Sequence, residues 1–281
     1  MPHLYISDLD GTLLDDTSKV SARSAEIISR LSADGAMISI ATARTPATVV
    51  PLLKDCNIRI PVVVMTGAAL WDMASQRYID AKLLNPEAVP EVIKSFREFG
   101  VSPFVYCIEG GMLEVYHHGR MTTEEQQFVD QRKGLPLKRF HLDSTPEQVD
   151  SAKDVILIFG MGEYENLHRV AEALNQNGEY SISFYEDNAS TLYYIEVFAR
   201  GISKAGAIQR LAEITEADKI TVYGDNLNDL SMMAIADDSV AVANAKPEVL
   251  KAASRIIGPN NEDAVANDIQ KNISKNPFLT E

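Results

Sequence analysis

Short runs of consecutive apolar residues recur near the start of the chain, and each run stops at a polar residue. The runs at 4–6, 36–41 and 60–65 read as buried strands. Residues 21–33 lie between the first two runs and carry apolar residues at helical spacing, with Gly35 after them as a stop signal. Near-continuous apolar strands that alternate with helices are typical of a parallel sheet covered on both faces.

The pattern changes after Asn85-Pro86. Residues 87–99 predict a helix, and after it come shorter, more aromatic strands with turns between them. These elements are strands at 101–108, 112–117, 154–159, 180–185 and 191–197, and helices at 123–132 and 164–175. Such strands favour antiparallel hairpins, so we expect an inserted α+β domain over residues 83–199.

The first pattern resumes at Gly201. The expected helices cover 203–214, 229–236, 247–253 and 262–272, and the expected strands cover 219–223, 239–242 and 255–257. Residues 1–82 and 200–281 therefore form one discontinuous α/β domain in this prediction.

The composition limits the possible partners. The 281 residues carry a formal net charge of −14, which argues against nucleic acid or an anionic membrane as a partner. No apolar run approaches the ~20 residues that span a bilayer, and the first ten residues lack the pattern of a secretory signal. Cys56 and Cys107 lie far apart and in no metal-ligand spacing, as expected of free thiols in a reducing compartment. We therefore expect a cytoplasmic protein, and the sequence contains no signal of its oligomeric state.

His117 and His118 invite interpretation as a metal site. Adjacent residues of a strand face opposite sides, however, so the two rings would not meet at one ion. We expect both to be exposed residues at a turn edge.

Two aspartates one residue apart follow the first apolar run. In an extended segment Asp8 and Asp10 face the same side, so their carboxylates repel each other. Such a pair at the end of a buried strand needs a cation, a shared proton or water. Gly11 comes next and lets the backbone turn sharply. Asp and Gly are also ordinary turn residues, so this stretch alone would fit a polar turn.

Polar groups follow other predicted core elements as well. They are Thr42 and Arg44 after the second strand, Lys204 at the start of a helix, and Asp225, Asn228 and Asp229 after a later strand. Alone, each would be an ordinary turn, surface or helix-cap residue. Ligands bind a parallel α/β sheet outside the carboxyl ends of its strands, so groups far apart in sequence can meet in one crevice. Together, carboxylates, a lysine, a hydroxyl and a divalent cation suit phosphoryl transfer.

The chain resembles the haloacid dehalogenase-like superfamily over essentially its whole length. The four motifs of that superfamily occur in order, as Asp8-x-Asp10-Gly11-Thr12, Thr42, Lys204 and Gly224-Asp225-x-x-Asn228-Asp229. The large insert and the stretch Ala241-Val242-Ala243-Asn244-Ala245 resemble the Cof-type branch, which has C2 caps and resembles sugar phosphatases. The resemblance implies a Rossmann-like, doubly wound parallel-sheet core with the insert as an α+β cap. It also implies Mg²⁺ as cofactor and hydrolysis of small phosphate esters, by default sugar phosphates.

The resemblance also implies roles for the motif residues. Asp8 would be the nucleophile, and Asp10 would be the general acid and base. The groups that bind the substrate's phosphate would be Thr42, Arg44, Lys204 and Asn228. The groups that bind Mg²⁺ would be the carboxylates of Asp8 and Asp225 and the backbone carbonyl of Asp10. Asp229 would orient these groups from behind.

The motifs depart from the Cof-type pattern in two places. Ala43 stands in the second motif where a glycine is usual, and this change would narrow the pocket near Arg44. The third strand ends at Thr66-Gly67, where the branch often has Asn-Gly, so a substrate contact would differ. Neither change removes an essential group.

We therefore expect a Mg²⁺-dependent phosphatase that acts on a small phosphorylated metabolite through an aspartyl-phosphate on Asp8. A phosphomutase of the same superfamily also fits the sequence. A third possibility is a non-enzymatic, receiver-like module that keeps its phosphoaspartate. Asp10 disfavours this module, because a general base beside the nucleophile promotes dephosphorylation. Besides sugar phosphates, pyridoxal phosphate and flavin mononucleotide remain open as substrates.

Overall fold

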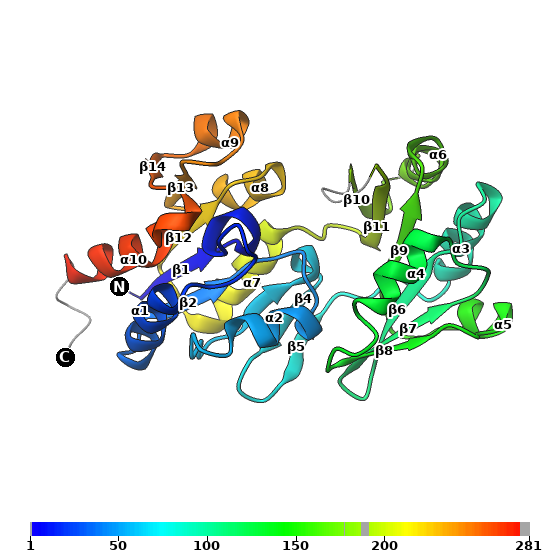
Figure 1. Ribbon diagram of the computed structural model, residues 1–281, viewed down its shortest axis with the longest axis horizontal. Coiled ribbons are helices and arrows are strands. Elements are labelled where there is room, and N and C mark those ends of the chain that lie inside the picture. The colour runs from blue at the N-terminus through cyan, green and yellow to red at the C-terminus, as the bar shows by residue number, and fades with distance from the viewer. Residues whose placement is uncertain (1, 177, 187–190, 276–281) are drawn as a thin grey trace. The chain divides into compact units, whose positions relative to one another are not determined.

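The protein consists of two compact units (Figure 1). The structure is a computed structural model that describes residues 2–176, 178–186 and 191–275. Unit 1 comprises Met1–Asp80 and Ser203–Glu281, and unit 2 comprises Ala81–Ile202. No helix in these three described ranges is both long enough and apolar enough to cross a membrane.

Unit 1 is built on a five-stranded sheet with the order β14-β13-β12-β1-β2, in which all neighbouring strands are parallel. The strands are β1 (His3–Ser7), β2 (Met37–Ile40), β12 (Lys219–Gly224), β13 (Asp238–Val242) and β14 (Arg255–Ile257). A smaller sheet contains β3 (Val62–Val64), β4 (Ala69–Asp72) and β5 (Arg77–Ala81). A parallel bridge between Ala41 and Val63 places β3 next to β2. This order brings the carboxyl ends of β1, β2 and β12 to one edge.

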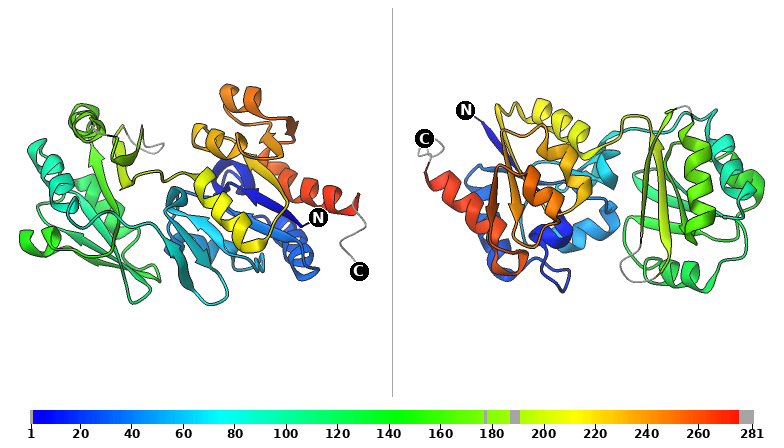
Figure 2. Two further views of the ribbon diagram at one scale, coloured as in Figure 1. Left: turned by 180° about the vertical axis from the view of Figure 1, so that it is seen from behind. Right: turned by 90° about the horizontal axis from the view of Figure 1, so that it is seen from above.

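Helices cover both faces of the unit 1 sheet (Figures 1 and 2). They are α1 (Ala22–Ala33), α2 (Pro46–Leu53), α7 (Lys204–Thr215), α8 (Leu230–Met233), α9 (Pro247–Ala252) and α10 (Ala264–Ser274). α1 packs on α10 and α7 packs on α8, and the two pairs lie on opposite faces. α1 starts where the Ser21 hydroxyl accepts a hydrogen bond from Ser24 N, and it buries Ile27, Ile28 and Leu31. Parallel strands with helices on both faces form the doubly wound α/β arrangement that the sequence predicts.

Unit 2 is an α+β unit around a six-stranded sheet with the order β10-β11-β9-β6-β7-β8. Its strands are β6 (Phe104–Glu109), β7 (Met112–His117), β8 (Lys138–His141), β9 (Val155–Gly162), β10 (Tyr180–Glu186) and β11 (Tyr193–Ala199). Its helices are α3 (Val89–Glu98), α4 (Thr123–Asp130), α5 (Pro146–Asp150) and α6 (Tyr164–Asn175). One face of the sheet forms a hydrophobic core with α3 and α6, and Phe96, Ile158 and Val170 are fully buried there. Unit 2 therefore has a core of its own.

Two features of unit 2 differ from the sequence prediction. β8 and α5 lie in a stretch where no element was expected, and β8 pairs with β7 in parallel among otherwise antiparallel neighbours. The prediction that His117 is exposed is wrong, because its side chain is buried and stacks on Phe104 at a centroid distance of 4.3 Å. His117 shares a strand face with Leu113 and Val115, which are also buried, so the alternation of β7 directs the ring inward.

Candidate active site

The site starts at the carboxyl end of β1. The backbone N–H of Asp8 donates to the Tyr223 carbonyl at 2.9 Å, so the pairing with β12 continues one residue beyond the strand. The chain then leaves the sheet in one helical turn, η1 (Leu9–Leu13), and this turn fixes Asp8 at the edge of the sheet. The Asp8 side chain is buried, and its Oδ1 accepts a hydrogen bond from Lys204 Nζ at 2.5 Å.

Lys204 joins the end of β1 to the segment after β12. It is the first residue of α7, whose start is capped by the Ser203 side chain. Its side chain is 0% exposed, and Nζ also donates to Asp229 Oδ1 at 2.7 Å. The other oxygen of Asp229 accepts hydrogen bonds from the backbone N–H groups of Asp225 and Asn226, each at 3.0 Å. A buried lysine is tolerable here because two carboxylates pair with it.

Asp225 is held from the opposite side by the loop after β1. Its Oδ1 accepts a hydrogen bond from Thr12 Oγ1 at 2.8 Å. Gly11 lies so close that a Cβ added to it would stand 2.5 Å from Asp225 Oδ2, and its φ is +77°. The Asn244 side chain donates to the Gly11 carbonyl at 2.7 Å. Only glycine fits this approach and this conformation.

Thr12 and Asn244 had no predicted role of their own. Both stand in stretches that the sequence had marked, namely the first motif and the run 241–245. A hydroxyl two residues after Asp10 was the available signal for Thr12. The contact of Asn244 with the Gly11 carbonyl joins segments more than 200 residues apart, so no local pattern reveals it.

Three carboxylates meet at this edge of the sheet. Oxygens of Asp8, Asp225 and Asp229 lie within 4.8 Å of one another. Burial raises the pKa of Asp8, against the pull of Lys204, and raises the pKa of Asp225 to about 6, against its bond to Thr12. Burial alone would lower the pKa of Lys204, but Asp8 and Asp229 outweigh it and raise that pKa. Three carboxyl groups thus surround one buried ammonium group, so the site can accommodate further positive charge.

The donor set fits a hard divalent cation such as Mg²⁺, which takes oxygen ligands. Both oxygens of Asp229 already accept hydrogen bonds, from Lys204 and from two backbone N–H groups. Asp8 and Asp225 each have an oxygen beyond the one bound by Lys204 or Thr12. These two carboxylates are therefore the ones suited to hold a metal.

Asp10 is placed differently from the expectation of two carboxylates side by side. β1 ends at Ser7, so the extended alternation that would align Asp10 with Asp8 does not continue. The Asp10 side chain instead pairs with Arg44, whose Nε and Nη2 donate to Oδ2 at 2.7 Å and to Oδ1 at 2.6 Å. The Asp10 side chain is 51% exposed and that of Arg44 29%. The cluster of oxygens therefore contains Asp229 and lacks the carboxylate of Asp10.

Thr42 and Asn228 are the remaining residues predicted for the site. Both follow strands that end at this edge of the sheet, but Thr42 is buried and Asn228 is exposed. Thr42 is buried, and its Oγ1 accepts a hydrogen bond from the backbone N–H of Arg44 at 3.1 Å. Asn228 belongs to the short helical turn η3 (Leu227–Asp229) and is exposed. The structure thus brings Asp8, Lys204 and the 225–229 segment into direct contact, with Thr42 beside Arg44.

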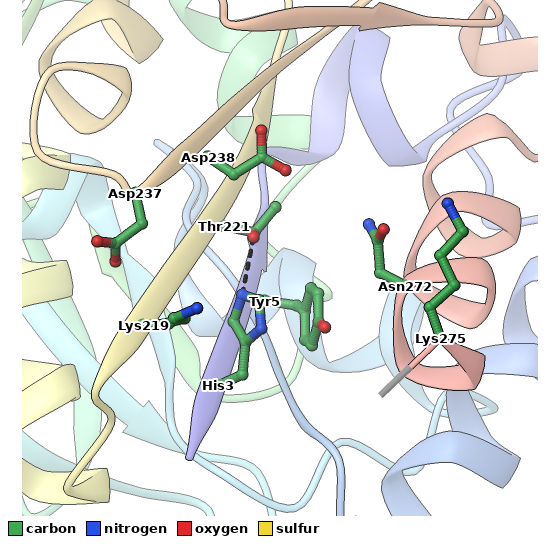
Figure 3. Close-up of a pocket in the computed structure, with 8 residues that line it drawn as sticks. All are labelled: His3, Tyr5, Lys219, Thr221, Asp237, Asp238, Asn272 and Lys275. Atoms are coloured by element: carbon green, nitrogen blue, oxygen red, sulfur yellow. Dashed lines mark hydrogen bonds between the residues drawn. The ribbon is translucent and has the colours of Figure 1, made fainter. Parts of the chain in front are cut away.

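A pocket of about 350 Å³ elsewhere in unit 1 is a different feature (Figure 3). His3 and Lys219 line it, and these are the first residues of β1 and β12. The pocket therefore lies at the opposite edge of the sheet from Asp8 and Asp225. His3 Nε2 is hydrogen-bonded to Thr221 Oγ1 at 2.8 Å. The lining includes two lysines and two aspartates, so their charges balance and would not attract an anionic substrate.

Comparison with known proteins agrees with this arrangement of carboxylates and a lysine at the edge of the sheet. A family model described as haloacid dehalogenase-like hydrolase matches residues 5–269, and the chain belongs to that family. A haloacid dehalogenase-like hydrolase from Bacteroides thetaiotaomicron has the same fold, with a TM-score of 0.79 at 24% identity over 96% of this chain and 99% of that one.

Some of the curated relatives are named for a specific substrate, and two of these serve as examples. One is 5-amino-6-(5-phospho-D-ribitylamino)uracil phosphatase YwtE of Bacillus subtilis, 26% identical over 285 residues that cover 95% of this chain and 96% of that protein. The other is pyridoxal phosphate phosphatase YbhA of Escherichia coli, 24% identical over 273 residues that cover 95% of this chain and 97% of that protein. The resemblance in sequence therefore extends over both units.

Proposed function

We propose that this protein is a Mg²⁺-dependent phosphatase that hydrolyses phosphate monoesters of small metabolites through an aspartyl-phosphate on Asp8. Its membership of a hydrolase family with phosphatase-named relatives supports the reaction class. The observation that carries the mechanism is the buried Asp8 carboxylate, which Lys204 binds inside a cluster of acids at the end of a parallel strand. A carboxylate held in this way can act as a nucleophile once further positive charge offsets its repulsion from a phosphate.

The first half-reaction transfers the phosphoryl group to the enzyme. The Asp8 carboxylate attacks phosphorus in line with the ester bond, and the phosphorus–oxygen bond to the leaving group breaks. Asp10 gives a proton to the leaving oxygen, so that an alcohol departs. Bound Mg²⁺ would neutralise negative charge on the phosphoryl oxygens. Asp8, Asp225 and the Asp10 carbonyl would hold it, as we propose from the donor set.

The second half-reaction regenerates Asp8. A water molecule gives its proton to Asp10 and attacks phosphorus, the bond between phosphorus and the Asp8 oxygen breaks, and inorganic phosphate leaves. Lys204 offsets the charge on Asp8 in both halves, and Asp229 holds Lys204 in place. Thr42 and Asn228 would donate hydrogen bonds to the phosphoryl oxygens.

We propose unit 2 as the cap that selects the substrate, because a mobile cap can exclude water and read the leaving group. The relatives YwtE and YbhA are named for a phosphorylated ribitylaminouracil and for pyridoxal phosphate. Both esters join sugar phosphates and flavin mononucleotide in the panel to be screened. The partner we propose is a small phosphorylated metabolite in the cytoplasm.

The first test removes the nucleophile. The substitution Asp8→Asn keeps the size of the side chain, and we expect it to lower phosphate release from p-nitrophenyl phosphate at least ~10³-fold. Wild-type activity should need Mg²⁺ and stop on addition of EDTA. The matched control is Asp16→Asn, an exposed aspartate that binds Asn261, which should keep wild-type activity. Full activity in Asp8→Asn would show that the nucleophile lies elsewhere.

The same assay separates the alternatives. A phosphomutase would convert a sugar phosphate into its isomer, with a requirement for a bisphosphate, and would release little free phosphate. A receiver-like module would accumulate a long-lived phosphoenzyme instead of turning over. Steady release of inorganic phosphate contradicts both.

A further inference from the structure

Lys138 of β8 is a buried cation without a counter-ion in the described part of the chain. The residue is 6% exposed, and its Nζ lies 5.3 Å from the ring centroid of Tyr106 and 5.9 Å from that of Phe140. No residue that the structure describes forms a hydrogen bond or an ion pair with this ammonium group. The buried Lys204 of unit 1, by contrast, has two carboxylate partners. A lysine is rarely buried unless its charge is paired, because desolvating an unpaired charge is costly.

A second cation near Lys138, the guanidinium of Arg132, also lacks a carboxylate partner. Its Cζ lies 4.0 Å from the ring centroid of Phe128, and its Nη1 donates to the Phe128 carbonyl and to Gln131 Oε1, each at 3.1 Å. Both acceptors are neutral, and no acid within the described ranges pairs with the guanidinium. Acids outnumber lysines and arginines 40 to 26 in this chain, so two neighbouring cations without an acid are unexpected.

The pairing of the strands places Lys138 on the face of the unit 2 sheet opposite to α3 and α6. Lys138 pairs with Leu113 of β7, and Leu113 pairs with Ile108 of β6. Side chains alternate along a strand, so Tyr106 shares a face with Ile108 and therefore with Lys138. Cys107 lies between these two residues of β6 and belongs to the hydrophobic core with α3 and α6. The ammonium group is thus directed away from that core.

A buried acid on the same face lies too far away to neutralise Lys138. Glu196 of β11 pairs with Phe159 of β9, and Phe159 pairs with Phe104 of β6, which shares its face with Tyr106. Glu196 is 8% exposed, and its Oε2 has no hydrogen-bond partner among the residues described. The strands β11 and β8 lie four strand spacings apart, on the order of 19 Å. The face therefore has a cation at one end and a separate hydrogen-bonding acid towards the other.

The surroundings of Lys138 favour a carboxylate over a phosphate as its partner. An anion beside Nζ must give up much of its water, because aromatic rings adjoin the ammonium group. A carboxylate carries one charge, whereas a phosphate monoester carries nearly two and costs more to desolvate. Arg132 Nη1 already donates to two acceptors, so Lys138 would provide most of the direct contact.

We propose that Lys138, with Arg132 beside it, binds a carboxylate on the leaving group of the substrate, so that unit 2 selects phosphate esters of hydroxy acids. This inference rests on the proposed function, in which unit 2 selects the substrate. Lys138 takes no part in making or breaking bonds and acts as a specificity-determining residue. The competing idea is a purely structural cation, which supports the fold of unit 2 and contacts no ligand.

Matched pairs of phosphate esters test this assignment on the full-length protein with Mg²⁺. Each pair consists of an alkyl phosphate that ends in a carboxylate and its counterpart that ends in a carboxamide, which keeps the shape and removes the charge. A series of increasing chain length identifies the ester that reaches both groups. At that length we expect the wild type to favour the carboxylate at least ~10-fold in kcat/KM, mainly through a lower KM.

The substitution Lys138→Met should abolish this preference, because kcat/KM for the carboxylate ester falls much further than kcat/KM for the carboxamide ester. Arg132→Gln keeps a polar side chain and should reduce the preference about 2- to 5-fold. The matched control is Lys94→Met, which replaces a lysine of the same unit whose side chain is 75% exposed and should keep the preference. Thermal unfolding of each variant shows that it is folded.

Two results overturn the proposal. One is a carboxylate preference that is absent at every chain length or is equal in the wild type and Lys138→Met. The other is an equal fall in kcat/KM for both esters of a pair in Lys138→Met, which is the result that a purely structural cation gives.

This proposal and the proposed function fail in distinguishable ways. If hydrolysis of the carboxamide esters depends on Asp8 but no preference for the carboxylate depends on Lys138, only the carboxylate site is lost. If Asp8→Asn hydrolyses both esters of a pair like the wild type, the proposed function itself is lost.

Discussion

Lys204 is the residue on which the candidate site depends most. It has a fully buried side chain and two carboxylate partners, Asp8 and Asp229, from different segments. Desolvating an ammonium group costs several kcal/mol, which only close, hydrogen-bonded partners offset. Removing either partner would leave a buried charge short of a counter-ion. The site is therefore also a structural joint between β1, α7 and the segment after β12.

Asp229→Asn tests this joint. Asp229 accepts from Lys204 on one oxygen and from two backbone N–H groups on the other, and an amide can accept on one side only. We expect the free energy of unfolding to fall by about 1–3 kcal/mol and phosphatase activity to fall with it, because Lys204 and Asp225 lose their support. Chemical denaturation and p-nitrophenyl phosphate hydrolysis measure the two effects.

Asp268→Asn is the matched control for that change. Asp268 is a carboxylate of α10 that accepts from Arg255, Tyr223 and Asn272. Its replacement should cost comparable stability and keep kcat. If Asp229→Asn likewise lowered only the stability and kept the wild-type kcat, Asp229 would have no part in holding Lys204 for the reaction.

At the scale of single residues, the sequence predicts which side chains of the site lie close together, but it does not predict all of their hydrogen-bond partners. Asp8, Lys204 and Asp225 were expected at one edge because each follows or begins an element of a parallel α/β domain, and chain order alone supports that. The pairing of Asp10 with Arg44 depends on where β1 stops and on side-chain torsions after the stop. Neither is encoded in an apolar pattern.

At the scale of the elements, the turn that follows β3 has an unusual backbone conformation. Met65, Thr66 and Gly67 all have positive φ, at 52°, 57° and 99°. Backbone N–H groups of this turn donate to the Arg44 and Thr42 carbonyls, each at 3.0 Å. The turn therefore supports the loop that carries two of the candidate phosphate-binding residues, Thr42 and Arg44. It does so in a conformation that costs a β-branched residue such as Thr66 free energy.

Gly67→Ala tests how closely this turn approaches α7. A Cβ on Gly67 would lie 2.2 Å from the Ser203 carbonyl oxygen, so the start of α7 would have to shift. Gly35 has a similar φ of +94°, but a Cβ there meets nothing within 4 Å. We expect Gly35→Ala to cost about 1 kcal/mol from the left-handed conformation alone and to keep activity. Gly67→Ala should cost about 2 kcal/mol more and lower kcat, since Lys204 follows Ser203.

Urea denaturation and hydrolysis assays of the two glycine variants check this prediction. Equal losses of stability in both would show that the clash at Ser203 relaxes freely. The close approach of the turn to the start of α7 would then not constrain the position of Lys204.

The elements also show where the sequence pattern loses its power. α6 and the strand pattern of unit 1 follow apolar periodicity and were predicted closely. β8 escaped because Lys138, Arg139 and His141 fill three of its four positions and leave no apolar run. A buried lysine in a strand is rare enough that pattern reading discards it.

At the scale of the whole molecule, two units with separate cores should not unfold as one. Unit 1 buries the strand residues Leu4, Ile6, Val222 and Val240, and unit 2 has its own cluster around Phe96 and Ile158. Units of this kind commonly give separate calorimetric transitions. A titratable group buried in one unit should then shift one transition only, and Lys138 in unit 2 is such a group.

Lys138→Met makes that expectation measurable. Burial, with Arg132 adding to it, lowers the pKa of Lys138 from 10.5 to about 7, and Nζ lies 5.3 Å from the Tyr106 ring centroid. Between pH 7 and 10.5 the unfolded chain binds this proton and the folded chain does not, so stability of unit 2 rises with pH. Below pH 7 the buried ammonium carries its full penalty. The methionine variant should therefore be more stable by roughly 2–4 kcal/mol at pH 6, and by much less at pH 9.5.

Scanning calorimetry at both pH values, with Lys94→Met as the control, decides the point. Lys94 is also in unit 2, but its side chain is 75% exposed, so its replacement should change neither transition by more than a few tenths of a kcal/mol. In Lys138→Met the transition of unit 1 should stay in place while that of unit 2 moves at pH 6. A shift of equal size at pH 6 and pH 9.5 would mean that methionine acts through packing alone. A joint shift of both transitions would mean that the two units unfold cooperatively, and that a substitution in unit 2 also changes the stability of the unit that holds Asp8.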